Sequence, residues 1–395
     1  MPDVPSTVRA STWVAAGMLV MNVVLYGFMV VAARLLVPAE FGALTALLGI
    51  LLIGNVLSLG LQAATARRLS VDPEHADEII AVVLRVMLLA GCTVGGLVAV
   101  ASVVLTPALK LDSIWTVVLC GLTLVPLTVM GAGAGIAQGT GRWRLLSAIY
   151  VANGTGRLLG GVVALLIDAS ATSAMVGIAI GACAPVVAAL PVMRSHGARP
   201  SVSRRPFVTE AFHGTHALLA YFVLSSLDAL IARNQFDEHT SGLYAAGLIL
   251  TKAALFTPQF VSVVVFPDLA RATSQNARAR AAGAVLAIGA AAVTLTFALQ
   301  PVALVLVGGH QYQEIQGRLW LFALSGSVLA IVHLLVFDAL ARHSHGVTVL
   351  LWAGAATLVA LAYGFDLGLT GLVVAVAAVS AVVAGVAWVL PAHRR

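Results

Sequence analysis

Two basic side chains lie deep inside segments that are otherwise apolar. Arg157 is about twelve residues into one apolar run, and Lys252 is about ten residues from the nearer end of another. A helix rises about 1.5 Å per residue, so Arg157 is expected at a depth of about 18 Å, near the middle of a hydrocarbon layer about 30 Å thick. A charge at that depth is costly and faces a partner or a water-filled cavity. Arginine binds a phosphate group bidentately and lysine binds it as a point charge, so the pair predicts an anion site.

Arg157 has an alternative interpretation, because backbone carbonyl groups of a packed interior can also satisfy a buried guanidinium group. Arg85 is a third candidate for the anion site. It lies only about six residues from the predicted cytoplasmic end of its segment, so its side chain can instead extend to the membrane surface.

A second group of charged residues lies near predicted segment ends. Asp228 is expected near an outer end, where pairing with Arg34 or Arg233 would latch an outer gate. Asp338 precedes Arg342 by four residues, a spacing typical of an ion pair on a helix surface. The candidates for gating or coupling are Asp228, Arg34, Arg233, Asp338 and Gln138.

Catalytic and metal chemistry is not indicated by the sequence. The three cysteines, Cys92, Cys120 and Cys183, all fall in apolar runs without the spacing of metal ligands. We find no nucleophile–base pair, metal cluster or nucleotide motif. The sequence therefore predicts neither an enzyme nor a cofactor.

The composition is that of an integral membrane protein. Hydrophobic residues make up 60% of the 395 residues and charged residues only 10%, against about 25% charged in soluble domains. The apolar runs are too long for outer-membrane strands, so the predicted class is all-α and polytopic. Twelve runs are long enough to cross a bilayer. They are residues 12–33, 41–63, 79–105, 114–136, 145–167, 173–193, 211–232, 242–266, 283–307, 319–340, 346–365 and 369–390.

The basic residues predict the orientation. If the N-terminus is cytoplasmic, fifteen of the 22 lysines and arginines lie on the cytoplasmic side, four lie outside and three lie within spans. This bias follows the positive-inside rule and places both termini in the cytoplasm. Orientation also explains the net charge of +6, so nucleic acid is not an expected partner.

The chain is predicted to consist of two six-helix lobes. Residues 194–210, with four arginines and two prolines, are expected to form a basic cytoplasmic linker between lobes at 1–193 and 211–395. Short sequence matches about 200 residues apart indicate a duplication, in which Arg34 of the first half corresponds to Arg233 of the second half. Arg157 corresponds to Thr357, so the charge is not duplicated, which favours a role in ligand binding.

Three segments carry a resemblance to a known family. They are ARLLVPAEFGALTALLGILLIGNVLSLGLQAATAR (33–67), GIAQGTGRWRLLSAIYVANGTGRLLGG (135–161) and SSLDALIARNQFDEHTSGLYAAGLILTKAALFTPQFVSVVVFPDLAR (225–271). With them the chain resembles the oligosaccharide flippases, or polysaccharide-biosynthesis exporters, of the multidrug/oligosaccharidyl-lipid/polysaccharide superfamily. The resemblance implies two six-helix lobes around a central cavity and alternating inward-open and outward-open states.

The resemblance also implies a polyprenyl-diphosphate-linked oligosaccharide as substrate, in the bacterial cytoplasmic (inner) membrane. Further implied partners are the lipid bilayer and the glycan polymerase or glycosyltransferases of the same pathway. Gln138 would then bind sugar hydroxyl groups, although its place at an interfacial turn equally suits helix capping. The alternative function is a cation-coupled multidrug exporter on the same fold. Basic groups at mid-depth, and spans of the first half without Asp or Glu, disfavour cationic substrates.

Overall fold

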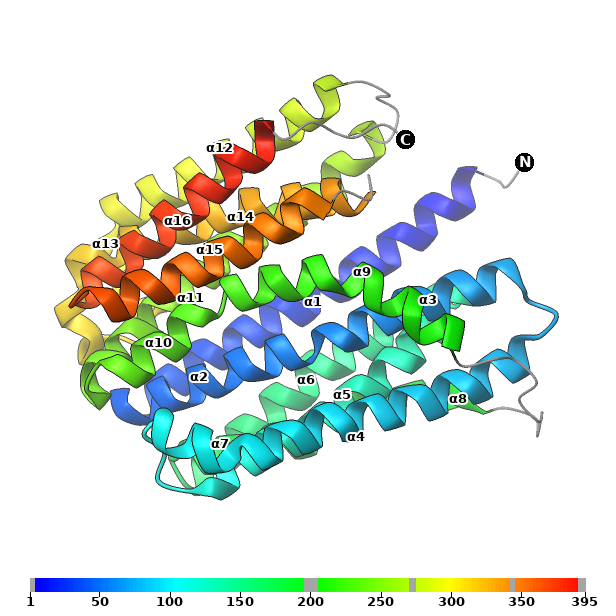
Figure 1. Cartoon of the computed structure of the whole chain (residues 1–395), viewed down its shortest axis with the longest axis horizontal. Coiled ribbons are helices and arrows are strands. Elements are labelled where there is room, and N and C mark those ends of the chain that lie inside the picture. The colour runs from blue at the N-terminus through cyan, green and yellow to red at the C-terminus, as the bar shows by residue number, and fades with distance from the viewer. Residues whose placement is uncertain (1–3, 195–204, 270–274, 342–344, 390–395) are drawn as a thin grey trace. The chain divides into compact units, whose positions relative to one another are not determined.

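The chain is almost entirely helical. The computed structural model describes residues 4–194, 205–269, 275–341 and 345–389, and these ranges contain helices and short connections but no strand (Figure 1). The all-α fold class predicted from the sequence is therefore confirmed. Most of the predicted linker lies outside the described residues, and its last six residues, 205–210, begin a helix.

Two compact units divide the structure. The first comprises Met1–Phe28 and Ile50–His216, and the second comprises Met29–Gly49 and Ala217–Arg395. Three helices begin in one unit and end in the other. They are α1 (Val4–Leu35), α2 (Pro38–Gly54) and α9 (Arg205–Leu224).

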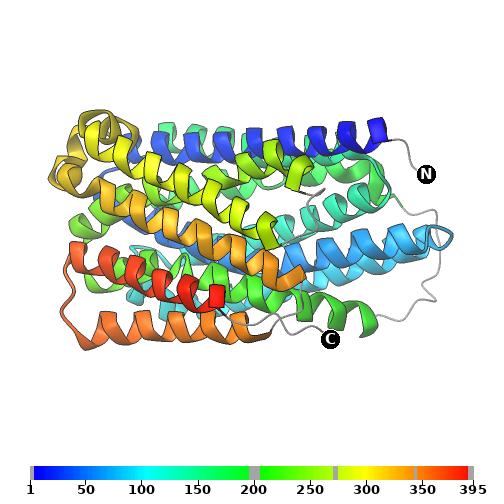
Figure 2. The same cartoon turned by 90° about the horizontal axis from the view of Figure 1, so that it is seen from above.

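Within each unit the helices lie roughly parallel or antiparallel to one another (Figures 1 and 2). The first unit contains α3 (Val56–Val71), α4 (Ala76–Ala108), α5 (Ile114–Gly139), α6 (Trp143–Ile167), α7 (Ala171–Gly181) and α8 (Ala184–Met193). The second contains α10 (Leu227–Gln235), α11 (Glu238–Leu269), α12 (Gln275–Ala298), α13 (Gln300–Leu306), the 3₁₀ helix η1 (His310–Arg318), α14 (Leu319–Ala341), α15 (His345–Gly364) and α16 (Leu369–Val389).

The helices match the predicted membrane spans. Eleven helical stretches of the described chain are long and apolar enough to cross a membrane. The remaining predicted span, 242–266, falls within the single helix α11. Side chains such as Leu61, Val83 and Ile136 form the apolar core of the first unit, where α3, α4 and α5 meet.

Four predicted spans are broken in the middle, which the apolar pattern does not reveal. The breaks separate α2 from α3, α7 from α8, α9 from α10 and α12 from α13. Pro185 and Pro301 occupy the first turns of α8 and α13, where the missing N–H group is tolerated. A break leaves backbone groups unpaired within a span, and one of these becomes part of a polar cluster described below.

The structure carries a trace of the duplication. Helix α1 ends at Leu35 and α2 begins at Pro38, while α10 ends at Gln235 and α11 begins at Glu238. Both boundaries of the second pair are 200 residues beyond those of the first, the offset expected from the sequence. Two connections of the same length therefore occupy equivalent places in the two halves.

Candidate functional site

Arg157 faces the interior of the first unit. Successive helical residues are about 100° apart, so Arg157 lies on the opposite side of α6 from Leu159, Val163 and Leu166, which are exposed. Its side chain is half-buried, and its Nε atom is buried without a hydrogen-bond partner in the part of the chain that the structure describes. Among the described residues no hydrogen bond or ion pair reaches the guanidinium group, whose electrostatic neighbour is Cys120 on α5. No described side chain of this unit therefore neutralises the positive charge.

Close packing fixes the backbone around Arg157. Gly156 and Gly160 on α6 face Gly181 and Gly177 on α7, and a Cβ atom at any of the four would overlap a backbone carbonyl oxygen of the opposite helix. Small residues four apart allow two membrane helices to approach in this way. The segment that carries Arg157 is thus held against α7 with no room to shift.

An amide–phenol cluster lies two turns from Arg157. Gln62 on α3 donates from Nε2 to Gln138 Oε1 on α5 at 3.3 Å, and to the Tyr150 hydroxyl on α6 at 2.9 Å. Gln62 is buried and the other two side chains are half-buried. Gln138 was predicted as a site residue, and the structure brings it together with Gln62 and Tyr150, which the sequence did not single out.

Arg85 lies elsewhere in the first unit. Its side chain is exposed on α4, on the same face as the exposed residues Leu88 and Leu89. A long basic side chain near a helix end can reach the membrane surface from such a position. This arrangement fits the alternative that Arg85 extends to the surface.

A polar cluster in the second unit contains Lys252. Helix α9 stops at Leu224 and α10 starts at Leu227, and the Ser225 carbonyl at this break accepts a hydrogen bond from Lys252 Nζ at 2.7 Å. In an unbroken helix that carbonyl would pair with the Ala229 amide, which instead donates to Asp228 Oδ1 at 2.9 Å. The helix break therefore creates the binding position of the ammonium group.

Asp228 belongs to the same cluster. It is 2% exposed, accepts a hydrogen bond from the Tyr244 hydroxyl at 3.2 Å, and interacts electrostatically with Lys252. The sequence predicted Arg34 or Arg233 as its partner, whereas the structure brings Asp228 together with Tyr244 and Lys252. Lys252, unlike Arg157, has a carboxylate close to it.

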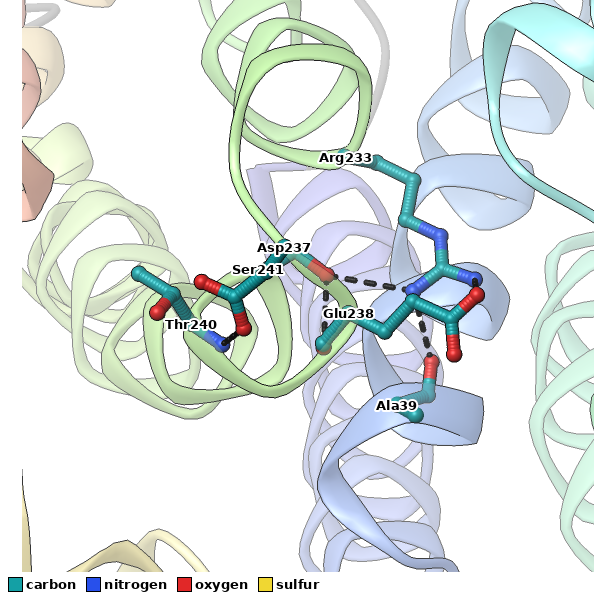
Figure 3. Close-up of polar contacts among 6 residues, drawn as sticks. All are labelled: Ala39, Arg233, Asp237, Glu238, Thr240 and Ser241. Atoms are coloured by element: carbon teal, nitrogen blue, oxygen red, sulfur yellow. Dashed lines mark hydrogen bonds and ion pairs between the residues drawn. The ribbon is translucent and has the colours of Figure 1, made fainter.

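The arginines at the segment ends bind backbone carbonyl groups instead. Arg34 Nη2 donates to the Val305 carbonyl of α13 at 2.9 Å. Arg233, which is 4% exposed, donates from Nη1 to the Ala39 carbonyl at 3.0 Å and to Ser241 Oγ at 3.1 Å (Figure 3). Its ion pair with Glu238 is long, at 3.9 Å.

These contacts join the two equivalent connections found above. Arg233 lies in the last turn of α10 and Ala39 lies in the first turn of α2, so the guanidinium group links the α10–α11 connection to the α1–α2 connection. The backbones also meet, since a Cβ atom at Gly42 would lie 3.0 Å from the backbone nitrogen of Gly242 and 2.8 Å from Ser241 Oγ. We call Ala39, Gly42, Arg233 and Ser241 the connection contact.

His75 and Asp237, which lie outside the predicted spans, have shifted pKa values. A hydrogen bond of 2.8 Å to Asp72 raises the pKa of His75. Hydrogen bonds from Thr240, including its amide at 2.9 Å, lower the pKa of Asp237, which precedes α11. Where the structure is described, no group of three or more His, Cys, Asp or Glu residues is suited to hold a metal ion. Asp338 lies in α14, but its predicted partner Arg342 lies outside the described residues, so this pairing stays a prediction.

Comparisons with known proteins address the fold. No family model matches the sequence, and no curated protein does. The chain is similar to an inward-facing structure of a multidrug resistance MATE family transporter of the MOP superfamily, with a TM-score of 0.74 at 13% identity over 95% of this chain and 96% of the other. The chain has the fold of these transporters.

Two further solved structures share this fold. An outward-facing multidrug resistance MATE transporter gives a TM-score of 0.68 at 15% identity, over 96% of this chain and 94% of the other. A MOP superfamily transporter from Pyrococcus furiosus, described as having a reversed polarity of its binding pocket, gives 0.67 at 14% identity over the same shares. At such identities the likeness confirms the two-lobe helical fold, and the oligosaccharide-flippase assignment stays a prediction.

Proposed function

We propose that this protein is a transporter that moves a polyprenyl-diphosphate-linked oligosaccharide across the bacterial cytoplasmic membrane by alternating access, for surface polysaccharide biosynthesis. The observation that carries the proposal is the guanidinium group of Arg157, which faces the interior of a membrane-spanning unit without a hydrogen bond or ion pair from any described residue. A charge in that position calls for a ligand of opposite charge.

A diphosphate group is a ligand of the required negative charge. Its oxygen atoms accept hydrogen bonds in the plane that a guanidinium group offers, so one arginine can hold it through two bonds. Carrying the same group through hydrocarbon without compensation is prohibitive, because an ionised group loses its hydration there. Arg157 would supply part of that compensation.

Lys252 has a secondary role in this proposal. Its ammonium group already binds the Ser225 carbonyl and lies in the field of Asp228, so less of its charge is available to a ligand. Arg157 would therefore hold the diphosphate, and Lys252 would add to the positive potential only after exchanging a partner. Arg85, on an exposed face of α4, is not needed.

The connection contact would act as an extracytoplasmic gate. With both termini in the cytoplasm, as the positive-inside rule predicts, the α1–α2 and α10–α11 connections face outward. Arg233 and Arg34 would close this side through backbone carbonyl groups rather than through Asp228. Such bonds form and break without burying a second charge.

A cation-coupled multidrug exporter is the second candidate. The solved structures with this fold include multidrug resistance transporters, and Asp228 is a buried carboxylate of the kind that binds cations. Its hydrogen bond from Tyr244 and its position near Lys252 reduce that capacity. Arg157, whose guanidinium group has no hydrogen bond or ion pair among the described residues, favours an anionic substrate instead.

A flipping assay tests the proposal. The protein is reconstituted into liposomes containing a fluorescent undecaprenyl-diphosphate oligosaccharide, and the fraction reaching the outer leaflet is followed by quenching. We expect Arg157→Gln to reduce the rate at least about tenfold, since a bidentate charged contact is lost, while Arg85→Gln behaves as the wild type. Equal rates for Arg157→Gln and wild type would reject the proposal, and efflux of a cationic dye by the same liposomes would favour the second candidate.

A further inference from the structure

One face of α6 carries a line of polar side chains inside the first unit. Tyr150, Asn153 and Arg157 are spaced three and four residues apart, so they lie on one side of the helix, away from exposed Leu159. Tyr150 and Arg157 are seven residues apart, which corresponds to about 10 Å along the axis. Polar side chains are rare in the interior of a membrane-spanning unit. Three of them on one side of a helix therefore indicate a functional role.

Several polar atoms on this face of α6 and on neighbouring α3 lack a partner among the described residues. Gln62 Oε1, Asn153 Oδ1 and Arg157 Nε are buried and receive or donate no hydrogen bond among the described residues. A buried polar group without a partner costs about 1–3 kcal/mol. These three atoms lie on two helices of the first unit, and since no described residue supplies their partner, they point to a bound ligand.

The amide–phenol cluster has both donors and acceptors to offer. Gln62 Nε2 already donates to Gln138 Oε1 and to the Tyr150 oxygen. The amide hydrogens of Gln138, the hydroxyl hydrogen of Tyr150 and the carbonyl oxygen of Gln62 take part in no hydrogen bond with the described residues. Gln138 and Tyr150 are half-buried, so a ligand can reach them.

This combination suits hydroxyl groups. A hydroxyl group donates one hydrogen bond and accepts others, so it pairs with an amide donor, a phenol donor and an amide oxygen at once. A phosphate group only accepts, and it would leave Gln62 Oε1 unpaired. The neutral cluster therefore differs in chemistry from Arg157, which only donates.

We propose that Gln62, Gln138 and Tyr150 form a neutral subsite for sugar hydroxyl groups, separated by two helical turns from the diphosphate subsite at Arg157. This inference rests on the proposed function, because it assigns the two ends of one headgroup to two positions on α6. The separation of about 10 Å matches a diphosphate followed by one or two sugar rings. The neutral subsite would select lipids that carry a glycan over the bare polyprenyl diphosphate.

Binding measurements with defined lipids test the two subsites separately. The probes are undecaprenyl diphosphate and the same lipid carrying an N-acetylhexosamine disaccharide, each titrated against the full-length protein in nanodiscs. The variants Tyr150→Phe and Gln138→Ala are compared with Tyr363→Phe. The control removes a hydroxyl that bonds Asn234 in the second unit. A monodisperse elution profile establishes that each variant is folded.

The wild type is expected to bind the glycosylated lipid at least about fivefold more tightly than the bare lipid, as one or two net hydrogen bonds provide. Tyr150→Phe and Gln138→Ala should remove most of this preference without changing the affinity for the bare lipid, whereas Tyr363→Phe should keep it. Preservation of the preference in both variants would overturn the neutral subsite.

The outcomes also separate this inference from the proposed function. If wild type binds both lipids equally and Arg157→Gln weakens both, the neutral subsite is wrong and the diphosphate site stands. If Arg157→Gln weakens neither lipid, the proposed function fails and the two-subsite assignment fails with it. If glycan preference depends on Tyr150 and overall affinity depends on Arg157, both are supported.

Discussion

At the scale of single residues, the two mid-depth cations differ in their surroundings. Both were predicted as anion ligands from their depth and their side-chain chemistry, because the sequence gives the position of a residue along a helix but not its neighbours. Lys252 proves to share a cluster with Asp228, which lies 24 residues away in the chain. Arg157 has no carboxylate neighbour of this kind among the described residues.

The pairing in the second unit predicts a non-additive effect on stability. Lys252→Met should destabilise the protein by about 1–3 kcal/mol, because it leaves the buried Asp228 carboxylate without its cation. The double variant Lys252→Met/Asp228→Asn should recover much of this loss. Unfolding of detergent-solubilised protein followed by tryptophan fluorescence measures both. Additive losses would show that the two charges do not interact.

At the scale of elements, local signals predicted the helices well but not their interruptions. Apolar runs and charge bias located the spans, whereas the break between α9 and α10 has no proline at Ser225 or Ser226. The sequence analysis also missed the amide–phenol cluster, because its three residues come from three helices and meet only when the helices pack. Gln138 alone could be nominated, from its position near a turn.

Helix α11 begins with a capping interaction that makes stability depend on pH. Asp237 accepts the Thr240 amide at 2.9 Å, so Asp237→Ala should cost about 1 kcal/mol at neutral pH and Asp237→Asn much less. The pKa of Asp237 is lowered from 3.8, so its contribution is complete above that value and is lost as the pH falls through the folded-state pKa. Unfolding measured at pH 7 and in acid should show the difference between wild type and Asp237→Ala shrinking. A difference independent of pH would contradict the assignment.

The close packing of glycines between α6 and α7 predicts how a substitution there changes stability. Gly160→Ala should destabilise the first unit by about 1–3 kcal/mol, because the new methyl group meets the Gly177 carbonyl oxygen, which cannot move aside. Gly96→Ala on α4 is the matched control, since a Cβ there has no atom within 4 Å. Thermal unfolding of the two variants compares them. Equal stability would mean that α6 and α7 can separate without cost.

At the scale of the whole molecule, the sequence and the contacts divide the chain differently. The duplication assigns residues 29–49 to the first lobe, and contact density groups them with the second unit. If residues 29–49 move with the first lobe, the connection contact must break during each transport cycle. If residues 29–49 stay with the second unit, the connection contact persists.

A cross-link decides between these divisions. In a background without Cys92, Cys120 and Cys183, the pair Gly42→Cys/Ser241→Cys should oxidise readily, since a Cβ at residue 42 lies 2.8 Å from Ser241 Oγ. Alternating access by two six-helix lobes predicts that the disulfide stops lipid flipping and that a reductant restores it. Full activity of the cross-linked protein would mean that residues 29–49 remain with the second unit.

The most direct test of the central claim is the identity of the lipid held at Arg157. Protein purified from its native membrane would be analysed by mass spectrometry for bound lipids, wild type beside Arg157→Gln and the control Arg85→Gln. We predict a polyprenyl-diphosphate glycan enriched over bulk phospholipid in the wild type and the control, and lost in Arg157→Gln. The same phospholipids in all three, with no diphosphate lipid, would contradict the claim that the uncompensated charge of Arg157 binds this substrate.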